Sequence, residues 1–541
     1  MTISREMRSH VSSHFERMPA RPILNFLVQF FLEEVNWISQ LIHPPSFMTR
    51  YESWWANQQH ASVSSLSVAD IDFAVLILRI CAFATQFLPS ASYMVDSVRG
   101  VPLAAIRETS TQAGDNLEKG ATGINPRGSL FRVQHMCFYA LNAACESHMK
   151  ESWSTLCSAI RVAQGPGYHQ EAKGADAMLV DEVEGEMRRR VFCNLYIVDG
   201  HLARQLDWVP FLTGELDVDC LPRMHLTPGV DPDSGAPDSF TERLLEARLV
   251  TFWRVMKPGH WANSEYDPNL AQQRHEKFHE DFINTLPPSF ALEPSREWDN
   301  RLPHLPLQRQ LLHVAIFESV CHNFRPLLLF ERARLHSLPA YKQVLILSQA
   351  RGLALAALKV LDAVSTLHDM IGATHTRFAT IIFHTFEASV LLLCLCIKGF
   401  LSESAAQDIA GLQTFPPDSS GGSHFGMGSL GQASSVDKEA HINRDRCIRE
   451  AQSALARLQV LANVSVMAEV SAQSLSQLLQ RATAAPGPVR TTTPTPTSVG
   501  DQDNQLSIPG ISWQEDVSDT PDTREESFTI RYARNFSADD Q

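Results

Sequence analysis

The chain is 541 residues long, more than one compact core of about 250 to 300 residues usually holds, so we expect two packed halves or a helical array with tails. Hydrophobic residues make up 44% and charged residues 20% of the chain, which indicates a globular protein and excludes a wholly disordered one. The formal net charge of −14 argues against non-specific nucleic-acid binding, which requires a basic surface.

In chain order, residues 1 to 20 are polar and are expected to be frayed. The spacing of apolar residues from Ile23 to Val35 predicts a helix, and the Pro44-Pro45 pair is expected to end that segment. The stretch Phe73 to Phe87 is apolar on nearly every face, which predicts a buried helix. Gly114 to Gly128 is predicted to be a loop.

Two further helices, Leu130 to Glu146 and Lys150 to Gln164, are joined by a short polar turn. We therefore expect them to pack as an antiparallel pair. A long helix with one apolar stripe is predicted from about Asp181 to Leu206.

In this long helix, Glu184 with Arg188 and Glu186 with Arg190 form i to i+4 pairs in the favourable orientation. We therefore interpret Arg188, Arg189 and Arg190 as a solvated helix face whose charges are paired. A nuclear-localisation or phosphate-binding role is the alternative, although acidic residues crowd the same turns.

After Pro222 the chain is rich in proline and aspartate up to about Asp238. Helices are then predicted at Thr241 to Met256, Leu270 to Leu286, Leu307 to Phe324, Tyr341 to His368 and Thr376 to Phe400. No alternating strand run and no hairpin pair is found, so the predicted fold class is all-α, a helical array. Residues 403 to 436, rich in Gly, Ser and Pro, and residues 483 to 541 are predicted to be disordered, with a helical segment at 437 to 482 between them.

The ten cysteines are scattered singly, apart from Cys394 and Cys396, and most have apolar neighbours. No secretory signal precedes them, so we expect buried free thiols in a reducing compartment. The apolar runs Val75 to Leu88 and Ser389 to Leu401 are shorter than the roughly 20 residues that cross a membrane, so no membrane span is predicted.

Three motifs raise the question of catalysis or ligation. His275, Glu276 and His279 match the H-E-x-x-H pattern of zinc proteases, but their flanks are those of an exposed helix and no third ligand follows at a suitable spacing. Residues 426 to 431 match G-x-G-x-x-G without the preceding strand that a dinucleotide site needs. His313 and His322 flank an apolar helical face and are interpreted as interior or rim histidines. We predict that the chain is not an enzyme.

Three signals between Trp153 and Pro222 occur in a fixed order. A helix ends at Gly165-Pro166 and is followed by Gly167, Tyr168 and His169; then come Glu186 to Arg190 with Asp199 further along the same helix, and finally Asp217, Asp219 and Pro222. This order resembles the regulatory "middle homology" domain of fungal zinc-cluster transcription factors. In that family a helix ending in Gly-Leu-His precedes Glu-x-Arg-Arg-Arg and an Asp-x-Asp-Val-x-Leu-Pro-like segment.

The resemblance extends over roughly residues 20 to 400. Asn36 with Leu41 to Phe47 resembles the family's entry motif, and His279 to Pro288 resembles its "W-x-x-x-LP" helix end. Leu311 to Leu328, which includes Arg325 and Pro326, resembles its "hRPfL" helix. Two departures are that Gly200 follows Asp199 where a basic residue is usual, and that Leu206 to Pro210 replaces a common Leu-Gly-Arg-Pro. The resemblance implies an all-α regulatory domain at residues 21 to 402.

The resemblance also implies a nuclear regulator of transcription, often of metabolic or secondary-metabolite genes. Family members contact DNA through a separate cluster of six cysteines and two zinc ions, and nothing in this chain matches it, so no cofactor is expected here and DNA would be reached indirectly. The implied partners are a zinc-cluster protein, in a homo- or heterodimer, and a coactivator. The alternative is an all-α small-molecule-sensing or scaffold protein of the same fold that does not itself bind DNA.

Acidic residues dominate the stretch from Asp501 to Glu526, interleaved with apolar residues that include Trp513. Such a composition cannot bury enough apolar surface to offset the roughly 1 to 2 kcal/mol needed to order each backbone residue. We therefore expect an unfolded tail whose exposed Trp513 recruits a coactivator; a solvated tail without a partner is the alternative.

Overall fold

The structure is a computed structural model, and it describes residues 13–60, 67–88, 97–122, 129–170, 181–226, 235–256, 266–371, 377–401 and 442–484. Three sequence predictions fall outside these residues: the loop at 403 to 436 with its G-x-G-x-x-G match, the acidic tail from residue 485 onward, and Trp513 within it.

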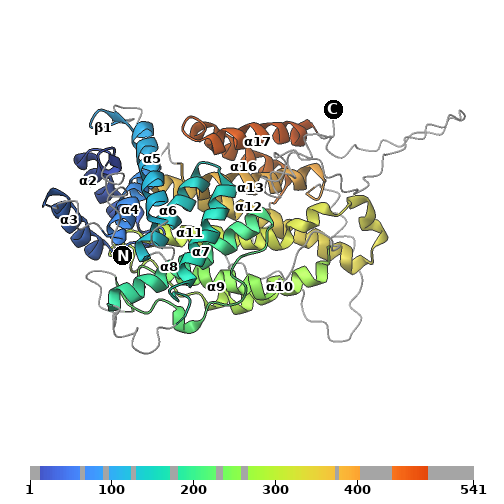
Figure 1. Ribbon diagram of the computed structural model, residues 1–541. Helices are drawn as coiled ribbons and strands as arrows, with labels where there is room; N and C mark the ends of the chain where they lie inside the picture. The colour runs from blue at the N-terminus through green and yellow to red at the C-terminus, as the bar shows by residue number, and fades with distance from the viewer. Residues whose placement is uncertain are drawn as a thin grey trace, which may run out of the picture.

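The described residues form an all-α array, which confirms the predicted fold class (Figure 1). The α-helices are α2 Arg21–Phe30, α3 Pro44–His60, α4 Val68–Ala84, α5 Leu103–Thr122, α6 Leu130–Cys145, α7 Met149–Gln164, α8 Glu182–Leu206, α9 Thr241–Met256, α10 Pro268–Asp281, α11 Leu305–Phe324, α12 Ala340–Ile371, α13 Ala379–Ile397, α16 Arg444–Leu461 and α17 Val466–Ala484. A π-helical turn, Phe31–Val35, extends α2, and 3-10 turns occupy Val218–Cys220, Ile283–Thr285, Arg325–Leu329 and Arg332–Ser337.

Most helices pack against helices that are close to them in the sequence. In Figure 1, α11, α12 and α13 run through the middle of the molecule, and the C-terminal pair α16 and α17 covers α13 on the outer side. Among the N-terminal helices, α4 packs against α5 and α6, and α6 packs against α7. Helix α8 contacts both α7 and α9, and α9 in turn contacts α11. The antiparallel pairing predicted for the two helices that became α6 and α7 is consistent with this contact.

Helix α4 is buried along almost its whole length, as its apolar sequence predicted. Its start is set by a capping box: the Ser67 hydroxyl accepts the Asp70 backbone N–H at 3.2 Å, and the Asp70 carboxylate accepts the Ser67 backbone N–H at 3.0 Å. Residues 1 to 20 were predicted to be frayed. Within this segment, Phe15 packs edge-on against Trp54 of α3 with ring centroids 5.7 Å apart.

Among the residues that the structure describes, two helices, α12 and α13, are long and apolar enough to cross a membrane by length and hydropathy alone. Within their most apolar windows, 72% of α12 and 78% of α13 is buried inside the protein. Their apolar faces are therefore already covered by neighbouring helices, as expected for the core helices of a folded domain.

Two local predictions were wrong. Gly114 lies within α5 rather than in a loop, and its missing side chain leaves room for the Arg79 guanidinium, since a Cβ at Gly114 would lie 3.2 Å from Arg79 Cζ. The part of the predicted loop after residue 122 lies outside the described residues. Pro44 does not end a helix but begins α3, where its fixed φ and missing N–H are tolerated in the first turn. The preceding helical segment ends earlier, at Val35.

The described residues also include one short hairpin that the sequence did not predict. Strands β1 Ser97–Val98 and β2 Val101–Pro102 pair antiparallel. Arg99 and Gly100 between them both have positive φ, 52° and 82°, which is the backbone of a tight two-residue hairpin turn. With only two residues in each strand, the hairpin leaves the fold class unchanged.

All ten cysteines are free thiols, and nine of them are buried. Burial raises the pKa of thiols such as Cys193, to about 12, so the thiol stays protonated at neutral pH. This confirms the expectation of buried free cysteines; the reducing compartment remains a prediction.

Candidate functional site

The first of the three signals between Trp153 and Pro222 is a helix end that packs against the next helix. Helix α7 ends at Gln164, and Gly167 has a φ of 82°, a left-handed conformation that favours glycine at this turn. The turn places Tyr168 in the core, where the Arg188 guanidinium of α8 lies 5.0 Å from the Tyr168 ring centroid. His169 packs on Phe192 of the same helix at 6.0 Å.

The Glu186 carboxylate is fully buried and accepts four hydrogen bonds. Three come from arginine side chains of the same helix: from Arg189 Nε at 3.1 Å, Arg189 Nη2 at 2.8 Å and Arg190 Nε at 3.1 Å. The fourth comes from the Arg223 backbone N–H at 3.0 Å. Arg223 directly follows Pro222, so this hydrogen bond connects α8 to the end of the third signal, the segment from Asp217 to Pro222.

Arg190 extends this network away from Glu186. Its Nη2 donates to the Met224 carbonyl at 2.9 Å and lies 3.3 Å from the Asp238 carboxylate, and its Nη1 donates to the Gln40 side chain at 3.2 Å. The side chain is only 3% exposed. The network therefore joins α8, the segment before α9 and the turn after α2.

The predicted solvated face was consequently wrong in part. Both expected pairs exist, but only Glu184 with Arg188, 2.6 Å apart, is partly exposed. The pair of Glu186 with Arg190 is in the interior, because its further partners come from segments distant in the sequence and cover it.

Asp199 forms a second buried junction on α8. Its carboxylate accepts the backbone N–H groups of Phe211 at 2.9 Å and Leu212 at 3.0 Å, and pairs with Arg254 of α9 at 2.9 Å. Burial raises the pKa of Asp199, while these hydrogen bonds and Arg254 oppose the shift. The junction holds the chain that leaves α8 against α9.

The next residue, Gly200, explains one departure from the family pattern. A Cβ at Gly200 would lie 2.4 Å from Val250 Cγ1 of α9, so there is no room for the usual basic side chain. The other departure, at the end of α8, places Asp207 in the left-handed conformation with φ 56°. Aspartate tolerates this conformation better than most residues, so the turn forms without glycine.

The remaining predicted motif residues lie at two places. Asp217 is exposed at the start of the 3-10 turn Val218–Cys220, and Asp219 lies within that turn. Arg325 ends α11 and is buried, with its Nη1 3.3 Å from Glu387 of α13 and its Nη2 donating to the Arg204 carbonyl of α8 at 3.4 Å; Pro326 follows in the 3-10 turn.

A buried charge cluster that sequence reasoning missed lies beside this last contact. Arg204 Nη2 donates to His201 Nδ1 at 2.8 Å, and His201 Nε2 lies 3.1 Å from the Glu246 carboxylate of α9. Because Nδ1 accepts from arginine, the proton of neutral His201 resides on Nε2 and is donated to Glu246. Arg204 also lies 3.3 Å from Glu318 of α11.

The ionisation states in this cluster follow from its burial. Burial lowers the pKa of His201 to about 3, and the neighbouring Arg204 acts in the same direction. Burial also lowers the pKa of His384 on α13 to about 4, although Glu318 opposes the shift. Burial opposes ionisation of Glu318, but the neighbouring positive charge, above all that of Arg204, outweighs burial and lowers the pKa of Glu318. At neutral pH both histidines are thus uncharged and Glu318 is ionised.

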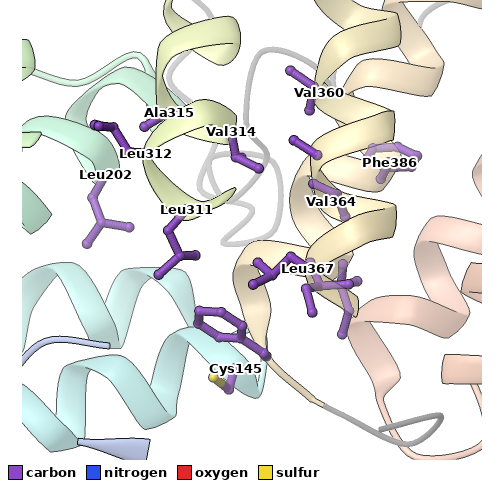
Figure 2. Close-up of a cluster of buried hydrophobic side chains, with 14 of the residues drawn as sticks. Cys145, Leu202, Leu311, Leu312, Val314, Ala315, Val360, Val364, Leu367 and Phe386 are labelled. Carbon is purple, nitrogen blue, oxygen red and sulfur yellow. The ribbon is translucent and has the colours of Figure 1, made fainter. Parts of the chain in front are cut away.

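Next to this cluster lies a cavity of about 200 Å³. Its walls come mainly from α6, α7, α8, α11 and α13, and most of its lining side chains are apolar. Figure 2 shows Cys145 of α6, Leu202 of α8 and Leu311 of α11 on facing helices around this region. His201, Glu246, Glu318 and His384 form its polar end. No sequence signal identified these residues, since single polar residues inside apolar helical stretches reveal their partners only after folding.

The H-E-x-x-H residues have structural surroundings. His275 packs on Phe324 with ring centroids 5.2 Å apart, and burial lowers its pKa to about 4, with His279 acting in the same direction. Glu276 is exposed and accepts from Gln272 at 3.0 Å. No group of three or more potential metal ligands gathers within the part of the chain that the structure describes.

The two other histidines singled out from the sequence, His313 and His322, are both buried on α11. His313 Nε2 lies 3.1 Å from the Ala291 carbonyl, a distance at which a neutral imidazole donates a hydrogen bond. Their interpretation as interior histidines is confirmed.

A scan against protein-family models gives no match. Among curated proteins, the chain is 40% identical over 481 residues to "Transcription factor xilB" of Penicillium rubens, covering 87% of this chain and 67% of the relative. It is 41% identical over 473 residues to "Probable transcription factor sol4" of Alternaria solani, covering 87% of this chain and 80% of the relative. The chain therefore belongs to the family of fungal transcription factors that includes these two proteins.

Proposed function

We propose that this transcription regulator controls a metabolic or secondary-metabolite gene set from the nucleus and contacts DNA indirectly, through a partner that carries the zinc cluster. The observation that carries the proposal is the similarity to two named transcription factors over 87% of the chain. The net charge of −14 favours indirect contact, because direct contact with DNA requires a basic surface.

Within this proposal, residues 21 to 402 act as the regulatory domain. Its motif residues support such a role because they hold helices together rather than presenting reactive groups: Glu186, Asp199 and Arg325 each pair with a residue from another element. The C-terminal helices α16 and α17 pack on α13, so we assign them to the same cooperative unit.

The proposal is tested in the organism that encodes the chain. A fluorescently tagged chain should accumulate in the nucleus, and deletion of the gene should change the transcript levels of a small, functionally related gene set. Chromatin immunoprecipitation should recover the tagged chain at those promoters, and removal of the zinc-cluster partner should abolish that recovery. A tagged chain that stays in the cytosol and a deletion without transcript changes would contradict the proposal.

The second candidate is a small-molecule-sensing or scaffold protein of the same fold that does not itself act at promoters. The cavity of about 200 Å³ beside the His201–Glu246 pair favours sensing. The two candidates differ in chromatin association, since only the first is expected to be recovered with promoter DNA.

A further inference from the structure

The geometry points to the cavity between α6, α8, α11 and α13 as the binding site of a compact, uncharged, mainly apolar molecule that carries one hydroxyl group. This inference deepens the proposed regulatory function by naming its ligand class, and it relies on that function only for the effect of binding on transcription.

The volume and the apolar lining of the cavity determine the size and the apolar character of the ligand. Apolar cavities of about 150 Å³ accept benzene, so a space of about 200 Å³ suits a ring with a short substituent, on the order of ten non-hydrogen atoms. Leu141, Leu156, Val198, Leu202 and Val314 are among the side chains that would contact it. Contact with these apolar side chains contributes to affinity but does not fix the orientation of the ligand.

The charge balance of the polar end excludes an ionised ligand. The Glu246 carboxylate pairs with Arg243 at 3.1 Å, and the Glu318 carboxylate with Arg204 at 3.3 Å. Each charge beside the cavity thus has an opposite partner, and the two histidines there are neutral. A carboxylate or ammonium in this space would lose its hydration without gaining an uncommitted counter-ion.

Polar side-chain groups that make no hydrogen bond at the same end of the cavity are the reason to expect a hydroxyl group on the ligand. The Gln205 side-chain amide, which lines the cavity, makes no hydrogen bond among the described residues. His384 Nδ1 also makes none there. A ligand hydroxyl can donate and accept at this end, whereas a hydrocarbon leaves the capacity unused.

The inference is tested with three matched probes on the purified full chain at pH 7. 4-Propylphenol has the apolar body and the hydroxyl, propylbenzene lacks the hydroxyl, and 4-propylbenzoate replaces it with a charge. Calorimetric titration should give a dissociation constant on the order of 10⁻⁵ M for the phenol. Propylbenzene should bind about tenfold more weakly, the loss of one hydrogen bond. The benzoate should bind at least about a hundredfold more weakly.

Two neighbouring alanines of α6 provide a matched pair of variants. Ala144 lines the cavity, whereas Ala143 is buried on the same helix without lining it. Ala144→Leu should weaken phenol binding by more than about tenfold with little change in the melting temperature. Ala143→Leu should lower the melting temperature and leave the affinity unchanged. If Ala144→Leu does not fold, Ala140→Leu narrows the same cavity from one turn away.

The hydroxyl assignment has its own variants. Gln205→Met and His384→Phe should each bring the affinities for phenol and propylbenzene closer together, because each removes a hydrogen-bonding group and keeps the volume. The inference is overturned if the benzoate binds as tightly as the phenol, if neither lining variant weakens binding, or if the hydroxyl preference survives in both polar variants.

The outcomes separate the site from the proposed function. Failure of all three probes to bind the folded chain removes the cavity as a ligand site and leaves transcription regulation standing. Binding that follows the expected order supports the ligand class even if deletion of the gene changes no transcript level, a result that would count against the proposed function alone.

Discussion

Replacing Glu186 with alanine should destabilise the protein strongly, because the carboxylate is the centre of a buried network. Its loss leaves Arg190, only 3% exposed, without its ion-pair partner on α8 and leaves the Arg223 N–H without an acceptor. Removing one member of a buried ion pair costs about 3 to 5 kcal/mol, and an unsatisfied backbone N–H adds about 1 to 3 kcal/mol. Asp238 stays near Arg190 and offsets part of this, so we expect a loss of roughly 4 kcal/mol.

Glu184→Ala is the matched control, two residues away on the same helix. Its pair with Arg188 is partly exposed, so its loss should cost only about 0.2 to 0.5 kcal/mol. The measurement is the midpoint of urea unfolding, followed by circular dichroism. The dependence of the unfolding free energy on urea concentration is compared between variants, to check that the same transition is observed in each. Equal, small shifts for both variants would refute the argument that Glu186 and Arg190 are an interior pair.

Four further predictions follow from the charges and motifs. Burial lowers the pKa of His201 to about 3 and of His384 to about 4, while the unfolded value is about 6.5, so the unfolded state binds protons first as pH falls. Each histidine should therefore cost about 2 kcal/mol of stability between pH 7 and pH 5, and His384→Gln should flatten the pH dependence of urea unfolding by that amount. The purified chain should bind duplex DNA weakly and without sequence preference in fluorescence anisotropy at physiological salt, and nanomolar, sequence-selective binding would contradict this. Elemental analysis should find no stoichiometric zinc, whereas about one zinc per chain that is lost in His279→Ala would overturn that expectation. Residues 485 to 541 fused to an unrelated DNA-binding domain should activate a reporter, with the activation falling in Trp513→Ala; activity no higher than that of the bare domain would favour a tail without a partner.

Much of the helical organisation was determined by the sequence alone. The predicted range of α9 agrees with the structure at both ends, and α8 and α11 begin or end within two residues of their predicted limits. These helices have apolar periodicity and local start or stop residues, which act over a few positions and are visible in one dimension. The same local reasoning failed at Gly114 and Pro44, because glycine serves close packing as well as turns, and proline begins helices as well as ending them.

The tertiary structure determines which charged side chains are buried in the interior. The sequence identified the pair of Glu186 with Arg190 from its spacing, but its burial depends on Gln40, Arg223 and Asp238, which only folding brings to α8. The cavity and its polar end were beyond local reasoning for the same reason, since α6, α8, α9, α11 and α13 each contribute only a few side chains to it. Helix position is set by neighbours in the chain, whereas burial, charge state and cavities are set by neighbours in space.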